Sequence, residues 1–120
     1  MKKTLLISIR SVEQLEQETL AAFKKVEAGL PGEEPINRLY FTDQNTLFSA
    51  LSPKRWELLR FLRKQGPMSI KKLAAELKRD YKNVYDDVKQ LSRLDLIEKK
   101  EDESFYVPWD DITIQLALAA

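Results

Sequence analysis

The polar residues best suited to specific chemistry lie on one face of a predicted helix at about residues 80–94. Val84, Val88 and Leu91 recur on the opposite face, which is typical of a helix that packs on a core through one stripe. The polar face carries Tyr81, Lys82, Asn83, Asp86, Lys89 and Arg93. An asparagine amide can read adenine through two hydrogen bonds, a lysine can reach guanine acceptors or phosphate, and a tyrosine hydroxyl can donate to phosphate. The residue types therefore suit nucleic-acid binding.

The same chain offers little to a catalytic mechanism. It has no histidine and no cysteine, so the common nucleophile–base pairs, disulfides and thiolate metal sites cannot be built. Carboxylates are paired at Asp86–Asp87 and Asp110–Asp111, but neighbours point about 100° apart on a helix and to opposite faces of a strand. The three glycines are too scattered to form a loop that cradles phosphate. We therefore predict a protein that is not an enzyme and that needs no cofactor and no metal.

Charge is distributed unevenly along the 120 residues, although the net charge is only +1. Residues 1–51 hold 6 basic and 7 acidic residues, residues 52–100 hold 14 and 7, and residues 101–120 hold 5 acidic residues and no basic one. The basic middle block attracts phosphate, although a solvated surface of lysine and arginine gives the same count. No apolar run approaches the roughly 20 residues that span a bilayer, and the run at Leu5–Ile7 is too short for a signal peptide. We expect a cytoplasmic protein with no membrane contact.

Residues 1–35 are predicted to form a strand and a helix that extend the main domain. Apolar and polar residues alternate between residues 3 and 10, as in a strand. Ser11 followed by Gln14 makes a capping box, so a helix begins there. Its apolar stripe needs a partner and consists of Val12, Leu15, Thr19, Ala22 and Val26, with Phe23 widening it. The glycine and proline content of residues 30–35 favours a connector and a candidate hinge.

Residues 36–120 are predicted to form the main domain. Ser52 followed by Pro53 is a helix start, and Ser69 is the cap of a second helix. The expected elements are a short strand at residues 36–41, a brief helix after Thr42 or Asp43, helices at about 53–65, 70–77 and 80–94, a hairpin at 96–107 and a strand at 112–118. Three compact helices followed by a hairpin indicate a helix-turn-helix of the α+β class.

About half of the chain resembles winged helix-turn-helix regulators of the MarR and ArsR type. The matching residues are Ser69-Ile70-Lys71-Lys72-Leu73-Ala74, then Asn83-Val84 and Val88, then Leu91-Ser92-Arg93-Leu94-Asp95-Leu96-Ile97 and a charged hairpin. In such proteins the second helix supports the third, the third enters the major groove, and the hairpin, called the wing, lies on backbone phosphates. The resemblance implies an α+β winged helix-turn-helix, here with an N-terminal strand-helix extension and a C-terminal strand.

The resemblance also implies where DNA would be contacted. The groove-facing positions of the third helix are matched by Tyr81, Lys82, Asn83, Tyr85 and Lys89, with Arg93 on the same polar face. Ser69 and Lys72 match positions at the start of the supporting helix that contact the DNA backbone. Packing at the edge of the core is the alternative role for the two tyrosines, because aromatic residues with polar tips often lie there.

Two positions depart from the family pattern. Asp95 stands where the family often has glycine, and aspartate tolerates the left-handed conformation better than most residues. The tip of the hairpin, Glu101-Asp102-Glu103, would repel phosphate. Only Lys99 and Lys100 are left as hairpin contacts to DNA.

A second resemblance is to short winged-helix antitoxins encoded beside small toxins. It rests on the N-terminal strand and helix, the helix start Ser52-Pro53-Lys54-Arg55-Trp56 and the exit Val107-Pro108-Trp109-Asp110-Asp111-Ile112. It implies a repressor that binds double-stranded DNA as a homodimer and captures a toxin protein. The candidate dimer interface is the last strand and the helix stripe, above all Val12, Leu15, Ala22, Phe23 and Val26; burial in the chain's own core is the alternative.

Two functions follow from these observations. The first is a sequence-specific transcriptional regulator, expected to be a repressor, which reads DNA with the helix at residues 80–94. The second is a protein-interaction module in which the winged helix serves only as a scaffold.

Overall fold

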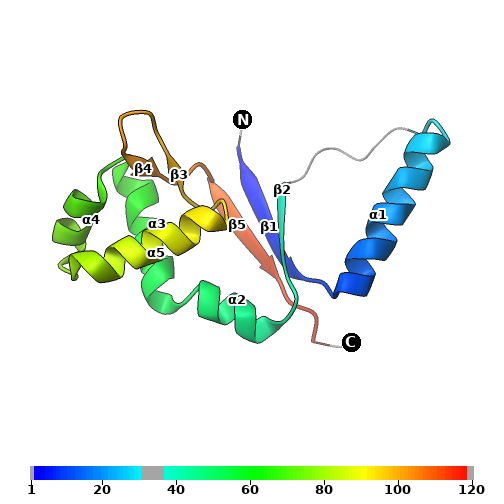
Figure 1. Ribbon diagram of the computed structural model, residues 1–120, viewed down its shortest axis with the longest axis horizontal. Coiled ribbons are helices and arrows are strands. Elements are labelled where there is room, and N and C mark those ends of the chain that lie inside the picture. The colour runs from blue at the N-terminus through cyan, green and yellow to red at the C-terminus, as the bar shows by residue number, and fades with distance from the viewer. Residues whose placement is uncertain (1, 31–36, 119–120) are drawn as a thin grey trace. The chain divides into compact units, whose positions relative to one another are not determined.

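The computed structural model describes residues 2–30 and 37–118, in which α-helices and short strands are mixed. The helices are α1 (Val12–Glu27), α2 (Gln44–Ala50), α3 (Pro53–Gln65), α4 (Ile70–Leu77) and α5 (Tyr81–Arg93). The strands are β1 (Thr4–Ile9), β2 (Asn37–Phe41), β3 (Glu98–Lys99), β4 (Phe105–Tyr106) and β5 (Asp111–Gln115), as Figure 1 shows. This mixed content is compatible with the predicted α+β class. In the described ranges no helix has the length and apolar character needed to cross a membrane.

The chain divides into two compact units. The helical unit comprises Met1–Lys3 and Phe48–Asp111, and the sheet unit comprises Thr4–Leu47 and Ile112–Ala120. The sequence had suggested a boundary at residue 35. That residue, the connector residues 31–35 and Ile36 lie outside the described residues.

The helical unit contains three helices and a hairpin around one apolar core. Ser52 caps α3 by accepting the backbone N–H of Arg55, and Ser69 caps α4 by accepting that of Lys72, which satisfies donors that a helix start leaves unpaired. The core is formed by Leu58, Leu59, Leu62, Met68, Ile70, Leu73, Ala74, Val84, Val88, Leu91, Leu96, Ile97, Phe105, Val107 and Trp109. The three predicted helices are thus confirmed, and Val84, Val88 and Leu91 of α5 bury the stripe that their spacing indicated.

The predicted hairpin is confirmed as the antiparallel pair β3–β4, in which Glu98 faces Tyr106 and Lys99 faces Phe105. Met68 and Phe105 exchange two backbone hydrogen bonds, of 3.1 and 2.9 Å, so the residues before α4 are joined to the returning strand. The turn after α5 depends on Asp95, which adopts a left-handed conformation with φ of 60°. The expectation that aspartate replaces glycine there is confirmed.

The residues after the hairpin are held by α3 and by the start of the chain. Arg63 donates to the backbone oxygen of Trp109 and to the carboxylate of Asp110. Asp110 also accepts the backbone N–H of Lys3 at 2.7 Å, and Lys3 accepts the N–H of Asp110 in return. The indole N–H of Trp109 donates to the Asp95 oxygen at 2.9 Å. These bonds fix the exit from the hairpin.

The sheet unit holds a three-stranded sheet in the order β2-β1-β5. β1 and β2 run parallel, with Leu5 beside Asn37 and Ile9 beside Phe41. Leu5 and Ile7 of β1 and Phe41 of β2 are buried. The alternation predicted for the first strand is only partly present, because Ser8 is also buried and Ile9 is half-buried. The capping box of Ser11 and Gln14 is present at the start of α1.

The last strand was predicted too long. β5 ends at Gln115, so Leu116 and Leu118 are not part of it, and Leu118 is fully exposed. A strand exists only where a neighbour pairs with its backbone, and β1, its neighbour in the sheet, has only six residues. The apolar alternation in the sequence therefore continues past the last residue that the sheet pairs.

Candidate functional site

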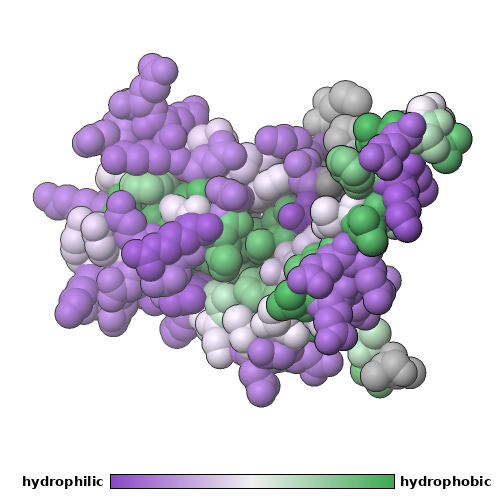
Figure 2. Space-filling view, turned by 45° about the vertical axis from the view of Figure 1, so that its right-hand side comes forward, coloured by the Kyte–Doolittle hydropathy of each residue, from purple (hydrophilic) through white to green (hydrophobic). Residues whose placement is uncertain are grey.

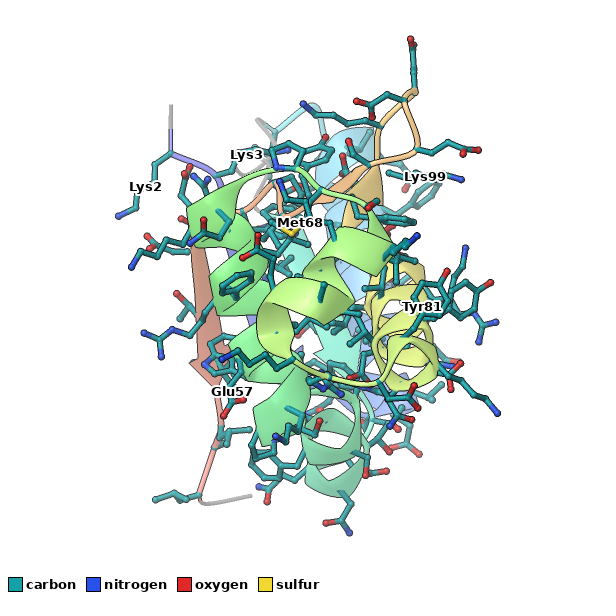
Figure 3. The ribbon with its side chains drawn as sticks, turned by 90° about the vertical axis from the view of Figure 1, so that its left-hand side faces the viewer. Lys2, Lys3, Glu57, Met68, Tyr81 and Lys99 are labelled. Carbon is teal, nitrogen blue, oxygen red and sulfur yellow. The ribbon has the colours of Figure 1, made fainter. Side chains whose placement is uncertain are left out.

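The candidate site is the polar face of α5 together with the adjoining hairpin. Val84, Val88 and Leu91 of this helix are fully buried. The side chains predicted to contact DNA are outside the core: Tyr81, Lys82, Asn83, Tyr85 and Arg93 are exposed, and Lys89 is half-buried. Figure 3 shows Tyr81 projecting outward from α5, and Lys99 extending from the hairpin. The predicted separation of an apolar and a polar face is confirmed for this helix.

The polar face has a narrower cationic stripe within it. At about 100° per residue, Lys82, Tyr85, Lys89 and Arg93 fall within an arc of about 80°. Tyr81 lies beside Tyr85, with ring centroids 6.2 Å apart. Asn83 lies about 100° away from Lys82 around the helix, on the stripe that Asp87 occupies one turn later. The helical period of α5 therefore groups the three cations and places Asn83 on the flank of their stripe.

Lys89 connects α5 to the hairpin. Its ammonium lies 5.3 Å from the ring centroid of Tyr85 and 5.9 Å from that of Phe105. The ammonium of Lys99 lies 5.9 Å from the same Phe105 ring. Attraction between a cation and the face of an aromatic ring holds a flexible lysine in place. The ring of Phe105 thus brings together one cation from the helix and one from the hairpin.

The hairpin presents both signs of charge. Lys100 lies over the ring of Tyr106 at 5.4 Å, and the Tyr106 hydroxyl donates to Glu98 at 2.7 Å, which raises the pKa of the phenol. At the tip, Asp102 accepts hydrogen bonds from the hydroxyl and the backbone N–H of Ser104, and these bonds lower the pKa of its carboxyl. The tip carboxylates are exposed. The predicted contrast between an acidic tip and the lysines on its first strand is therefore present in the fold.

Ser69 and Lys72 lie at the start of α4. The Ser69 oxygen accepts the N–H of Lys72 at 3.1 Å, so this hydroxyl already serves as a helix cap. Its proton remains a donor for an outside acceptor. Both side chains are exposed.

Sequence reasoning missed the role of Asp87, which it considered only as one member of a carboxylate pair that does not converge on one point. Asp87 accepts Arg55 Nε on Oδ1 at 3.0 Å and Arg79 on Oδ2 at 2.7 Å. The exposed fractions of the three side chains are 14% for Asp87, 21% for Arg55 and 19% for Arg79. Its neighbour Asp86 is exposed. The helical period pointed to different directions for the two carboxylates, but no local signal paired Asp87 with residues 32 and 8 positions earlier.

The stripe predicted for dimerisation lies on α1, and none of the side chains of this helix is buried. Phe23 and Val12 are each 60% exposed and Val26 is 70% exposed, while Leu15 is half-buried and Ala22 exposed. Figure 2 shows hydrophobic side chains, in green, at the surface of α1. A groove of about 690 Å³ within the sheet unit is lined by Leu15, Glu18, Thr19, Ala21, Ala22, Lys25 and Val26 of α1 and by Arg38 and Tyr40 of β2. Exposed apolar side chains on one helix are candidates for a protein–protein contact when they form a continuous patch.

The part of the chain that the structure describes contains no group of three carboxylate, histidine or cysteine side chains placed to hold a metal ion. The arrangement of α5 and the hairpin offers cations, amide and hydroxyl groups, which are the groups that bind nucleic acid.

One protein family matches this chain, HVO_A0114, over residues 50–114. The chain belongs to the HVO_A0114 family. The matched segment contains α3, α4, α5 and the β3–β4 hairpin, which together carry the candidate site. No curated protein and no solved structure matches the chain.

Proposed function

We propose that this HVO_A0114 protein is a sequence-specific DNA-binding regulator, with α3, α4, α5 and the β3–β4 hairpin acting as a winged helix-turn-helix. In this proposal α5 enters the major groove, and the hairpin is the wing that follows the backbone. The observation that carries the proposal is the cationic stripe of α5, which continues onto the hairpin through the ring of Phe105.

The order of elements supports the proposal. α4 begins at a serine cap, a short turn leads to α5, and the hairpin follows at once. The first part of α5 carries Tyr81, Lys82 and Asn83 on its exposed surface, and in helix-turn-helix proteins these N-terminal positions of the reading helix contact base edges. Lys72, Lys99 and Lys100 supply cations for phosphates on either side. The acidic tip, Glu101 to Glu103, would remain away from the DNA.

The test is a mobility-shift titration with the DNA upstream of the protein's own gene and a scrambled duplex of the same length and composition. We expect tighter binding to the upstream duplex, and a loss of affinity with salt, because lysine contacts release counterions from the phosphates. Equal binding to both duplexes at every salt concentration would contradict the proposal.

We also propose that the protein acts as a homodimer through the stripe of α1, which would match a two-fold symmetric operator. The support is the 16-residue helix α1, of which no side chain is buried in the protomer. Phe23→Glu is expected to yield monomers in sedimentation equilibrium, because it would place a charge in an apolar interface. Phe48→Glu is the matched control, since Phe48 is 53% exposed but lies on α2.

The same exposed stripe favours a second candidate function, that of a protein-interaction module that captures a partner such as a toxin. The two functions separate in one comparison. Lys82→Ala together with Asn83→Ala abolishes preferential DNA binding if the protein is a regulator, and it leaves partner binding intact if the winged helix is only a scaffold.

A further inference from the structure

We infer that Asp87 is a positioning residue that holds the reading face of α5 at a fixed orientation and thereby sets the specificity for DNA sequence. This inference rests on the proposed function, since it concerns how the same helix reads DNA. Asp87 itself does not contact DNA in this proposal. It acts through the orientation of the side chains that do.

The carboxylate of Asp87 joins three segments of the helical unit. Arg55 lies in the first turn of α3, and it donates from Nε to Asp87 and from a terminal nitrogen to the Ala50 oxygen at 3.2 Å. Arg79 lies between α4 and α5, where it follows the left-handed residue Lys78. Each carboxylate oxygen of Asp87 therefore has its own guanidinium partner, and each partner belongs to a different segment.

The network constrains rotation of α5 about its axis. Charge-assisted hydrogen bonds at 2.7 and 3.0 Å require a narrow range of positions for the carboxylate. Buried Val84, Val88 and Leu91 hold one side of the helix by packing, which is not strongly directional. Asp87 adds a directional contact on a neighbouring stripe, and Asn83 lies on that stripe one turn earlier. A change in the position of Asp87 would therefore alter the orientation of the first part of α5, including Asn83, which would read bases in the proposed complex.

Loss of the carboxylate would leave two guanidinium groups close together and largely out of water. One terminal nitrogen of Arg79 is already buried without a hydrogen-bond partner among the described residues. Like charges in a partly desolvated place repel each other more strongly than in water. The turn before α5 would therefore move away from α3, and Tyr81, Lys82 and Asn83 would move with it.

A role of Asp87 through its charge alone predicts a different effect on DNA affinity than a role in positioning α5. Replacing aspartate by asparagine removes one negative charge from a DNA-binding surface, which raises affinity for any duplex. If Asp87 only contributed charge, Asp87→Asn would bind all DNA more tightly. If Asp87 positions α5, the variant loses preference for its own site, while its affinity for unrelated DNA stays the same or rises with the lost negative charge.

The experiment measures binding by fluorescence anisotropy to two duplexes, one enriched by the wild-type protein from a random-sequence library and one scrambled version of it. The variants are Asp87→Asn and Glu76→Gln, the latter being the same charge change at an exposed position of α4. We expect the ratio of the two affinities to fall about tenfold in Asp87→Asn, a change similar to that from one mismatched base pair. We expect the affinity of Asp87→Asn for the scrambled duplex to be no lower than that of the wild-type protein, and we expect Glu76→Gln to keep the wild-type ratio.

An unchanged ratio in Asp87→Asn, or an equal fall in Glu76→Gln, would overturn the inference. If circular dichroism shows that Asp87→Asn is unfolded, Arg79→Lys replaces it, because lysine keeps the charge but cannot reproduce the planar guanidinium. A lowered ratio in that variant supports the inference, and an unchanged ratio overturns it. Failure of the proposed function can be distinguished from failure of this inference alone, because the wild-type protein itself would then show no preference between the two duplexes. In that case the inference would fail together with the proposed function.

Discussion

Replacing Lys82 by alanine tests the proposed DNA-binding face most directly. Lys82 is exposed and lies at the N-terminal end of the cationic stripe of α5. The cations placed toward DNA in the proposal number six per protomer: Lys72, Lys82, Lys89, Arg93, Lys99 and Lys100. Each phosphate neutralised contributes about 0.9 to the slope of log affinity against log salt, so a full set predicts a slope of about −5 per protomer.

The removal of Lys82 is expected to reduce this slope by about 0.9 per protomer. Between about 50 mM and 200 mM salt, the wild-type affinity should fall roughly 10³-fold, and the affinity of a Lys82→Ala protomer should fall about threefold less. The assay is a fluorescence anisotropy titration of a labelled duplex at four or more salt concentrations. Lys24→Ala is the matched control, because Lys24 is exposed on α1, outside the proposed face.

Two results would refute the reasoning. An identical slope in Lys82→Ala and the wild-type protein would mean that Lys82 neutralises no phosphate. An equal change in Lys82→Ala and Lys24→Ala would mean that only the net charge matters and that α5 has no special place in binding.

Three further substitutions test the local structure. Lys78→Gly is expected to raise the free energy of unfolding in urea by about 0.5–1 kcal/mol, because Lys78 has φ of 55° and glycine adopts this conformation without strain; a loss of stability would contradict this. Ser69→Ala should lower the same quantity by about 1 kcal/mol through loss of the cap, and no change would show that the cap is dispensable. The pKa of Asp110 is held below its usual value by the N–H of Lys3 and by Arg63, so its contribution to stability is present above about pH 4 and is lost as the pH falls through the lowered pKa. Asp110→Asn should therefore be less stable at pH 7 and should lose less stability on acidification than the wild-type protein, and parallel pH profiles in urea would exclude this role.

The local elements of this chain could be predicted because their signals are short-range. The serine caps at Ser11, Ser52 and Ser69 each accept the backbone N–H that their position in the sequence predicted. The brief helix expected after Thr42 or Asp43 is present as α2, and Asp43 accepts the N–H of Thr46 at 2.7 Å. Caps and helical periods involve residues three or four positions apart, so they can be identified without the tertiary structure.

The parts that could not be predicted depend on contacts between distant residues. The partners of Asp87 lie 32 and 8 positions away, so no local pattern could identify them. The end of β5 depends on pairing within the sheet, where its neighbour β1 lies more than 100 residues earlier in the chain. For the site, the helical period was enough to predict the polar face and to separate Asn83 from the cationic stripe, but the contacts of Lys89 and Lys99 with the Phe105 ring required the tertiary structure.

The two backbone hydrogen bonds between Met68 and Phe105 have a consequence for the kind of duplex that would fit. They tie the hairpin to the residues before α4, while the ammonium groups of Lys89 and Lys99 each lie 5.9 Å from the centroid of the Phe105 ring. In the proposed complex, the spacing between α5 and the lysines of the hairpin would therefore be set by the protein, not by the DNA. A duplex whose groove is wider or narrower than this spacing has to deform, at an energy that depends on the stiffness of its base steps. Flexible steps such as TA or CA beside the contacted bases would then favour binding without being touched by any side chain.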